Sequence, residues 1–176
     1  MRPTKLQRLW ARLGIPAEVA TRAAKRLHPE ARRLVFIGRA ADDRRLLRLA
    51  PAAARAWREM QAAAARDGVT LVPLSAFRST ARQTLIIRRK LARGQRIDDI
   101  LKVSAVPGCS EHHSGCALDL GAPGHLRLEA SFAKTQEFRW LRRHARRFGF
   151  HLSYPRGNRQ GIAYEPWHWC WRKQHQ

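Results

Sequence analysis

The spacing of apolar and polar residues predicts three long helices. Residues 50–67 are rich in alanine, a strong helix former, and Gly68 suits the position just after a helix ends. Ser79 is a good N-cap for a second helix, which we expect to run to about residue 92. Residues 131–148 show the clearest periodicity, with one apolar face and an opposite face of arginines.

Short apolar runs between and after these helices predict strands. They cover residues 69–74, 117–120 and 150–154, with a further pair at roughly 162–164 and 167–171. Residues 97–109 are expected to form a loop, since Pro107-Gly108 is a turn signal. Helices that precede a group of short strands are typical of an α+β fold, here with helices packed on a small antiparallel sheet.

The N-terminal segment differs from the rest of the chain. Residues 1–33 predict two or three short basic helices, the second starting at Pro16. Residues 34–37 are apolar enough to favour docking on the main domain over a disordered basic arm. We therefore divide the chain into a basic helical N-terminal extension, residues 1–49, and a main domain, residues 50–176.

The charge of the chain is strongly unbalanced. There are 35 Lys and Arg residues against 13 Asp and Glu, a formal net charge of +22. This favours polyanionic partners, which are nucleic acid, anionic lipid or an anionic cell-wall polymer. A coding bias toward arginine in a GC-rich genome would raise the same count without any partner.

The sequence leaves the location of the protein open. No run of 18 apolar residues is present, so no transmembrane helix is expected. Arg12 interrupts the apolar stretch near the N-terminus, which does not resemble the core of a signal peptide. The chain would be cytoplasmic, exported by another route, or preceded by a targeting segment.

Three cysteines do not describe a disulfide framework in a chain of 176 residues. We expect Cys109, Cys116 and Cys170 to be free thiols. A single disulfide between Cys116 and Cys170 is the alternative.

Two segments carry residues suited to a metal site. Residues 110–119 contain His112 and Asp119, and the motif Glu165-Pro166-Trp167-His168 adds a second histidine three residues after a carboxylate. Catalytic zinc takes three protein ligands and leaves a fourth position for water. His112 and Asp119 are seven positions apart, so a straight strand would place them on opposite faces, and a bend at Gly115 is required. Pro166 must likewise distort its strand, and no HExxH helix is present.

These segments resemble the VanY-type D-alanyl-D-alanine carboxypeptidases, which share a fold and metal site with the zinc domain of Hedgehog proteins. The resemblance is carried by Ser-x-His-x-x-Gly-x-Ala-x-Asp at 110–119 and Glu-Pro-Trp-His at 165–168. Residues 75–79 with Gln83, 135–141, 148–150 and 154–155 are also similar to the family, so the resemblance covers about residues 50–171. Phe77 stands where the family has tyrosine.

The resemblance implies a fold and a set of roles. The fold would be the α+β Hedgehog/DD-peptidase fold, in which the sheet carries the zinc site, and residues 50–176 would be a zinc DD-carboxypeptidase domain. His112, Asp119 and His168 would hold one Zn²⁺ ion, and Glu165 would be the catalytic base.

Four further residues would act on the substrate. Arg78 would stabilise the oxyanion or bind the substrate carboxylate. Gln83 and Ser110 would bind the peptide terminus, and Trp167 would form a wall of the cleft.

The implied reaction is hydrolysis of the C-terminal bond of a peptidoglycan stem peptide or its precursor, releasing D-alanine. An L,D-carboxypeptidase or a lysin-like endopeptidase of the same fold is the alternative within this class. A basic nucleic-acid-binding protein with a structural zinc is the alternative from another class. Nucleic acid is disfavoured because zinc-finger spacing, an aromatic RNP motif and a helix-turn-helix are all missing from the sequence. Retention of Glu165 argues against a relative that only binds.

Overall fold

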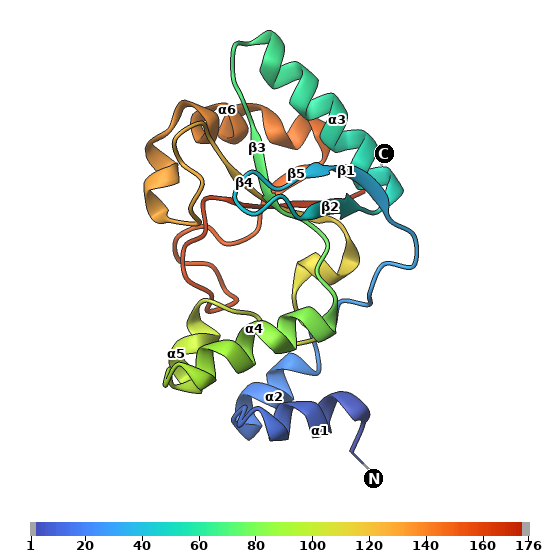
Figure 1. The fold of residues 1–176 in the computed structure, drawn as a ribbon, viewed down its shortest axis with the longest axis vertical. Coiled ribbons are helices and arrows are strands. Elements are labelled where there is room, and N and C mark those ends of the chain that lie inside the picture. The colour runs from blue at the N-terminus through green and yellow to red at the C-terminus, as the bar shows by residue number, and fades with distance from the viewer. Residues whose placement is uncertain (1–2, 174–176) are drawn as a thin grey trace.

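The computed structural model describes residues 3–173, and the chain folds there into two groups of helices on either side of a small sheet (Figure 1). The α-helices are α1 (Lys5–Arg12), α2 (Ala17–Ala23), α3 (Pro51–Arg66), α4 (Thr80–Ala92), α5 (Ile97–Lys102) and α6 (Gln136–His144). The 3-10 helices are η1 (Glu111–Ser114), η2 (Ala130–Lys134) and η3 (Ala145–Phe148). The strands are β1 (Val35–Arg39), β2 (Leu46–Leu49), β3 (Val72–Ser75), β4 (Ala117–Gly121), β5 (Phe150–Leu152) and β6 (His168–Trp171).

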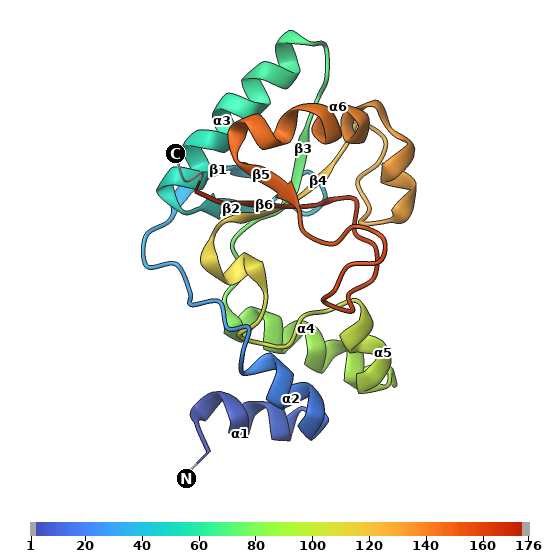
Figure 2. The same ribbon diagram turned by 180° about the vertical axis from the view of Figure 1, so that it is seen from behind.

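The main sheet has the strand order β3-β4-β6-β5, and each neighbouring pair is antiparallel (Figure 2). Strand β4 is central, and all five of its residues are buried. The expected α+β architecture with a small antiparallel sheet is therefore confirmed.

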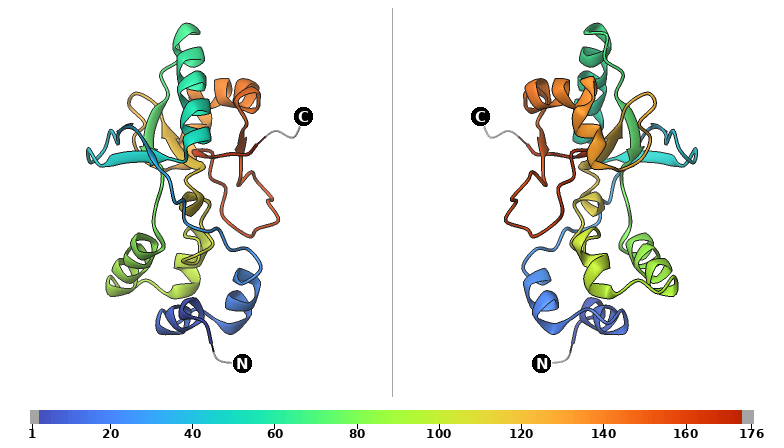
Figure 3. Two further views of the ribbon diagram at one scale, coloured as in Figure 1. Left: turned by 90° about the vertical axis from the view of Figure 1, so that its right-hand side faces the viewer. Right: turned by 90° about the vertical axis from the view of Figure 1, so that its left-hand side faces the viewer.

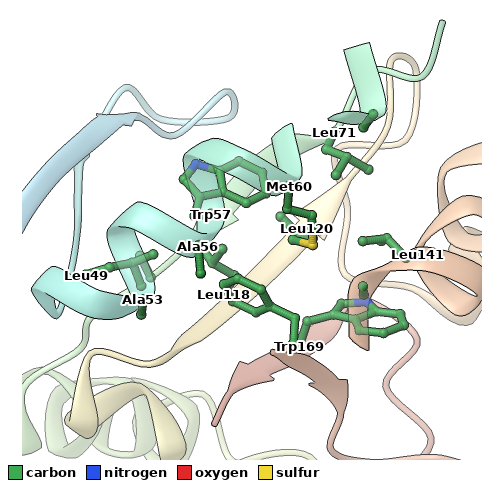
Figure 4. Close-up of a cluster of buried hydrophobic side chains, with 14 of the residues drawn as sticks. Leu49, Ala53, Ala56, Trp57, Met60, Leu71, Leu118, Leu120, Leu141 and Trp169 are labelled. Atoms are coloured by element: carbon green, nitrogen blue, oxygen red, sulfur yellow. The ribbon is translucent and has the colours of Figure 1, made fainter. Parts of the chain in front are cut away.

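One face of the sheet packs against α3 and α6. Trp57 and Met60 of α3 meet Leu118 and Leu120 of β4, and Trp169 of β6 belongs to the same buried cluster (Figure 4). These five side chains are 0–2% exposed, so this cluster supplies most of the apolar burial that fixes β4 and β6. The rigidity of these two strands matters because both carry residues of the candidate site.

A second apolar cluster joins the N-terminal helices to α4 and α5. Trp10, near the end of α1, packs with Ile87 of α4 and Ile100 of α5. The Trp10 indole Nε1 donates a hydrogen bond to the Pro107 carbonyl at 2.8 Å. Figure 3 shows α1 and α2 beneath α4 and α5, at the end of the molecule opposite α3. The N-terminal helices are therefore docked, as expected.

The helical expectation for residues 1–49 is wrong for residues 35–49, which form the β1–β2 hairpin. Leu47 and Leu49 are buried and alternate with the exposed Leu46 and Arg48 along β2, and this period of two lets both buried leucines join the α3 cluster. The hairpin therefore packs with the main domain, whereas α1 and α2 pack with the second cluster.

Residues 97–109 are not all loop, because α5 occupies Ile97–Lys102. Asp98 and Asp99 lie in its first turn, where carboxylates favour a helix, and Ile100 is fully buried. The single turn of apolar periodicity was too short to predict a helix from sequence.

The single helix expected over 131–148 is divided at Thr135. Its backbone is extended, with φ −75° and ψ 160°, and its side chain accepts a hydrogen bond from the Phe138 backbone nitrogen. Thr135 is thus the N-cap of α6, preceded by η2. The apolar face survives the break, since Trp140, Leu141 and Ala145 are buried.

The strand expected at 162–164 is not formed. The Asn158 side chain donates a hydrogen bond to the Ile162 carbonyl, and the Ala163 backbone nitrogen donates to Lys102 at the end of α5. The segment between β5 and β6 is therefore a loop that reaches α5 instead of pairing with β6.

The three cysteines are free thiols, as expected. Burial raises the pKa of Cys109 to about 11 and raises that of Cys170 as well. Within residues 3–173, no helix is long and apolar enough to span a membrane.

The docking of α1 gives a prediction. We expect Trp10→Ala to destabilise the protein by about 3–5 kcal/mol, because the large cavity left in the second cluster cannot collapse fully. Urea unfolding measures this, and limited proteolysis should cut near α1 and α2 before it cuts α3. Arg12→Ala, at an exposed position of α1, is the matched control. Equal stability of the two variants would contradict the docking.

Candidate metal centre

Three buried side chains from two parts of the chain meet on one face of the main sheet, at its two inner strands. His112, Asp119 and His168 each offer a donor atom, and these atoms all lie within 4.8 Å of one another. His112 Nε2 is 3.1 Å from Asp119 Oδ2, and His168 Nδ1 is 3.0 Å from Asp119 Oδ1. Two imidazole nitrogens and a carboxylate oxygen form a donor set typical of zinc.

The sheet register explains why Asp119 and His168 are neighbours. They are direct partners across the antiparallel pair β4–β6, so their side chains lie on the same face. Pairing across the sheet thus brings together residues that are 49 positions apart.

His112 reaches the same point because the chain bends between it and β4. Gly115 ends η1 with φ +68°, a left-handed conformation that favours glycine. A Cβ atom at Gly115 would also lie 2.9 Å from the backbone nitrogen of Ala50. The bend predicted at Gly115 is confirmed, and it removes the conflict posed by the spacing of His112 and Asp119.

Hydrogen bonds orient both imidazole rings. His112 Nδ1 is 2.7 Å from the Ala76 carbonyl oxygen, which can only accept, so Nδ1 carries the proton and Nε2 faces Asp119. His168 Nε2 is 3.0 Å from Glu111 Oε2, which leaves Nδ1 directed toward Asp119. The second nitrogen of each ring, His112 Nε2 and His168 Nδ1, therefore faces Asp119, and once deprotonated it can present a lone pair to a metal ion there.

Glu111 is a functional residue that the sequence analysis missed. Besides His168, it accepts a hydrogen bond from the Ser153 hydroxyl and lies 3.6 Å from Arg172. Burial alone would raise the pKa of Glu111, but the bonds from His168 and Ser153 lower it to about 2, so it is ionised. The position of Glu111 next to His112 in the sequence was a signal that it could lie at the site, but nothing in the sequence indicated its contact with His168.

Asp119 is an anion held between cations and donors. Burial alone would raise its pKa, but the nearby His112 and His168 hold it well below the usual range. Arg78 adds a guanidinium 3.5 Å from the Asp119 carboxylate.

Glu165 is the second carboxylate that faces this cluster. Its Oε2 atom is 3.9 Å from His168 Nδ1, and the backbone turn over 165–168 is closed by a bond from the His168 nitrogen to the Glu165 carbonyl. Burial raises the pKa of Glu165 to about 7, against the opposing effect of His168. A carboxyl group with such a pKa can both accept and return a proton near neutral pH.

Arg78 is fixed from three sides. Besides Asp119, its guanidinium donates to Gln83 Oε1 at 2.9 Å and to Ser75 Oγ at 3.2 Å. The Gln83 amide in turn donates to the Ala105 carbonyl at 2.8 Å. Gln83 is 1% exposed, and both ends of its amide are hydrogen-bonded within the protein. It contacts Arg78 but is not among the residues that line the cavity, whereas the sequence predicted that it would bind the substrate.

A cavity of about 350 Å³ opens over the cluster. The predicted residues that line it are Arg78, Ser110, His112, Asp119, Glu165, Trp167 and His168. Its other walls include Lys90, Val103, Ser104, Leu128 and Tyr154. The geometry thus combines a three-donor metal site, a proton acceptor and a guanidinium in one water-accessible space.

Comparison with known proteins adds the family to this geometry. The family model described as VanY, D-alanyl-D-alanine carboxypeptidase, matches residues 46–174, which include every residue of the cluster. The chain belongs to the VanY family. The match starts at residue 46, within the β1–β2 hairpin, in agreement with the packing of β2 on the main domain.

The chain is also similar in sequence to a protein named as a carboxypeptidase. The putative carboxypeptidase YodJ of Bacillus subtilis is 34% identical over 121 residues, which are 66% of this chain and 43% of YodJ. This chain therefore spans less than half the length of that relative.

Two solved structures share the fold. The LdcB LD-carboxypeptidase has a TM-score of 0.72 at 28% identity, over 81% of this chain and 69% of LdcB. A mutant of the vancomycin-resistance D,D-pentapeptidase VanY, solved with Zn(II), has a TM-score of 0.60 at 27% identity, over 82% of this chain and 83% of its own. The DD-peptidase fold expected from the sequence is confirmed.

The bond between Glu111 and His168 gives a prediction. We expect Glu111→Gln to weaken zinc binding by about 10–100-fold, because a carboxylate partner fixes the ring and raises the basicity of a histidine ligand. Competition with a chromophoric chelator measures this affinity. Glu59→Gln, at an exposed position of α3, is the matched control. Unchanged affinity in the Glu111 variant would show that His168 needs no such support.

Proposed function

We propose that this chain is a zinc-dependent D-alanyl-D-alanine carboxypeptidase that hydrolyses the C-terminal peptide bond of peptidoglycan stem peptides. The observation that carries the proposal is the buried His112–Asp119–His168 cluster with Glu165 on the same cavity wall. The donor set fits one zinc ion, because both rings direct to the same point a nitrogen that can bind zinc once it is deprotonated, and the cavity beside them can admit a fourth ligand. In this proposal His112 Nε2, Asp119 and His168 Nδ1 are the ligands.

A bound zinc ion would polarise the scissile carbonyl and lower the pKa of water to about 7. Glu165 acts as the base: it takes a proton from the attacking water and returns it to the leaving amine. The distance of 3.9 Å between its Oε2 atom and His168 Nδ1 supports this role beside the proposed metal position. In the metal-free protein, burial raises the pKa of Glu165 to about 7, which supports a role in proton transfer.

Arg78 stabilises the negative charge that develops on the carbonyl oxygen. Its side chain is 19% exposed, so it reaches the cavity while Ser75 and Gln83 hold it in place. A guanidinium aimed in advance at this charge needs no reorganisation during the reaction. Gln83 then acts by positioning Arg78, and Ser110 and Trp167 are the predicted substrate contacts that line the cavity.

The peptidoglycan substrate and the location in the cell envelope are proposed from the family of the chain. The net charge of +22 supports contact with an anionic cell-wall polymer, and the exposed arginines of α6, such as Arg142 and Arg143, provide a surface for it. For the domain organisation, we propose that α1 and α2 form the extension and that the β1–β2 hairpin belongs with the catalytic domain.

The decisive prediction concerns release of free D-alanine from a stem pentapeptide that ends in D-Ala-D-Ala. We expect release by the zinc-loaded protein, loss with a chelator, and recovery when zinc is restored. Glu165→Gln should lower kcat by at least about 10²-fold while zinc stays bound, because it removes the proton acceptor and leaves the ligands intact. Glu59→Gln is again the control.

The outcomes separate the candidate reactions. Release of the last residue from a stem tetrapeptide, with none from the pentapeptide, would assign the L,D-carboxypeptidase reaction that LdcB is named for. Cleavage of intact peptidoglycan alone would assign an endopeptidase. Absence of any hydrolysis, with zinc bound, would overturn the enzymatic proposal and favour the basic nucleic-acid-binding alternative.

A further inference from the structure

Lys90 lies on the wall of the cavity, and the reaction described above gives it no role. It comes from the last turn of α4, and its ammonium donates a hydrogen bond to the Ser104 hydroxyl at 2.9 Å. Lys90 and Ser104 line the same cavity as Arg78 and Glu165. Two further N–H groups of the ammonium and the hydroxyl proton of Ser104 stay available to a ligand.

The ammonium has no acidic partner within ion-pair distance among residues 3–173. The other cation of the cavity, Arg78, is matched by Asp119 at 3.5 Å. Burial, and then the charge of Arg78, lower the pKa of Lys90 against the opposing effect of Glu165, so the net environment disfavours the charge it carries. A half-buried cation with no carboxylate within ion-pair distance favours the binding of an anion.

The surroundings of Lys90 indicate a peptide ligand. Val103 and Leu128 also line the cavity, and both are large apolar side chains exposed to solvent, at 52% and 43%. Exposed apolar side chains beside a few placed polar groups are typical of a ligand site. A short peptide with small apolar side chains and a carboxylate would cover Val103 and Leu128 and pair with Lys90.

We propose that Lys90 and Ser104 form a subsite that binds a carboxylate group of the peptide substrate. This inference rests on the proposed function and names a specificity determinant for it. The carboxylate has two possible sources: the free C-terminus of the peptide, or an acidic side chain upstream of the cleaved bond. A lysine ammonium suits either, as a point charge on a flexible stem that forms charge-assisted hydrogen bonds.

The test uses calorimetry to measure peptide binding to two zinc-loaded proteins. One carries Glu165→Gln alone, and the other carries Glu165→Gln together with Lys90→Met. Three synthetic peptides that end in D-Ala-D-Ala are used: one with a free C-terminus and a neutral third residue from the end, its C-terminal amide, and one with a free C-terminus and glutamate at that third position. Arg89→Met, at an exposed position of the same helix, is the matched control. Circular dichroism and the urea midpoint check that each variant is folded.

The expected result is a selective loss of about 10-fold in affinity, which corresponds to about 1.4 kcal/mol. If the C-terminus is the source, Lys90→Met weakens both free acids and leaves the amide unchanged. If an acidic side chain is the source, only the glutamate peptide loses affinity. Ser104→Ala should follow the same pattern with a smaller loss, and Arg89→Met should show none.

Equal weakening of all three peptides, no weakening, or no binding of any of them would overturn the subsite. Turnover by the protein with Glu165 intact is measured in parallel. If the protein turns over substrate but Lys90→Met causes no selective loss of affinity, the subsite is rejected and the proposed carboxypeptidase activity stands. If Lys90→Met causes a selective loss of affinity but the protein turns over no substrate, the subsite is supported and the proposed hydrolysis is rejected.

Discussion

The pairing of Asp119 with His168 across the β4–β6 ladder is the constraint on which the site depends. Asp119 is 2% exposed, at the centre of a sheet whose strands are covered by α3 and α6. A buried carboxylate is stable only when charges and donors surround it. His112, His168 and Arg78 provide them, so the apolar packing that fixes β4 and β6 also fixes the distances between the donor atoms.

Hydrogen bonds from neighbouring groups hold the side chains of the site in place, on the sides that face away from the candidate metal position. The Ala76 carbonyl selects the tautomer of His112, Glu111 does so for His168, and Gln83 orients Arg78. Each is buried or nearly so, and therefore exchanges its hydrogen bonds with water less readily than a surface group. The site is preorganised before a metal or peptide binds, which is the property that electrostatic catalysis requires.

The sequence predicted the residues that cluster at the candidate site more completely than the elements around them. His112, Asp119, Glu165 and His168 were found from motif resemblance, because the chemistry of a metal site limits which residue types can serve. The break at Thr135 was missed because the apolar face continues across it, and a cap is a local competition that periodicity does not report. Glu111 was missed because its partner, His168, is 57 positions away and is brought close only by strand pairing. The hydrogen bonds of Gln83 to Arg78 and to the Ala105 carbonyl were likewise not predicted, since only the fold brings these groups together.

X-ray absorption spectroscopy at the zinc edge of the zinc-loaded protein tests the central claim most directly. The account predicts one zinc ion with two imidazole nitrogens at about 2.0–2.1 Å and the remaining ligands oxygen, with one imidazole lost in each of His112→Ala and His168→Ala. Sulfur in the first shell from Cys116 or Cys170, or an unchanged number of imidazoles in either variant, would contradict the assignment of this cluster as the catalytic metal centre.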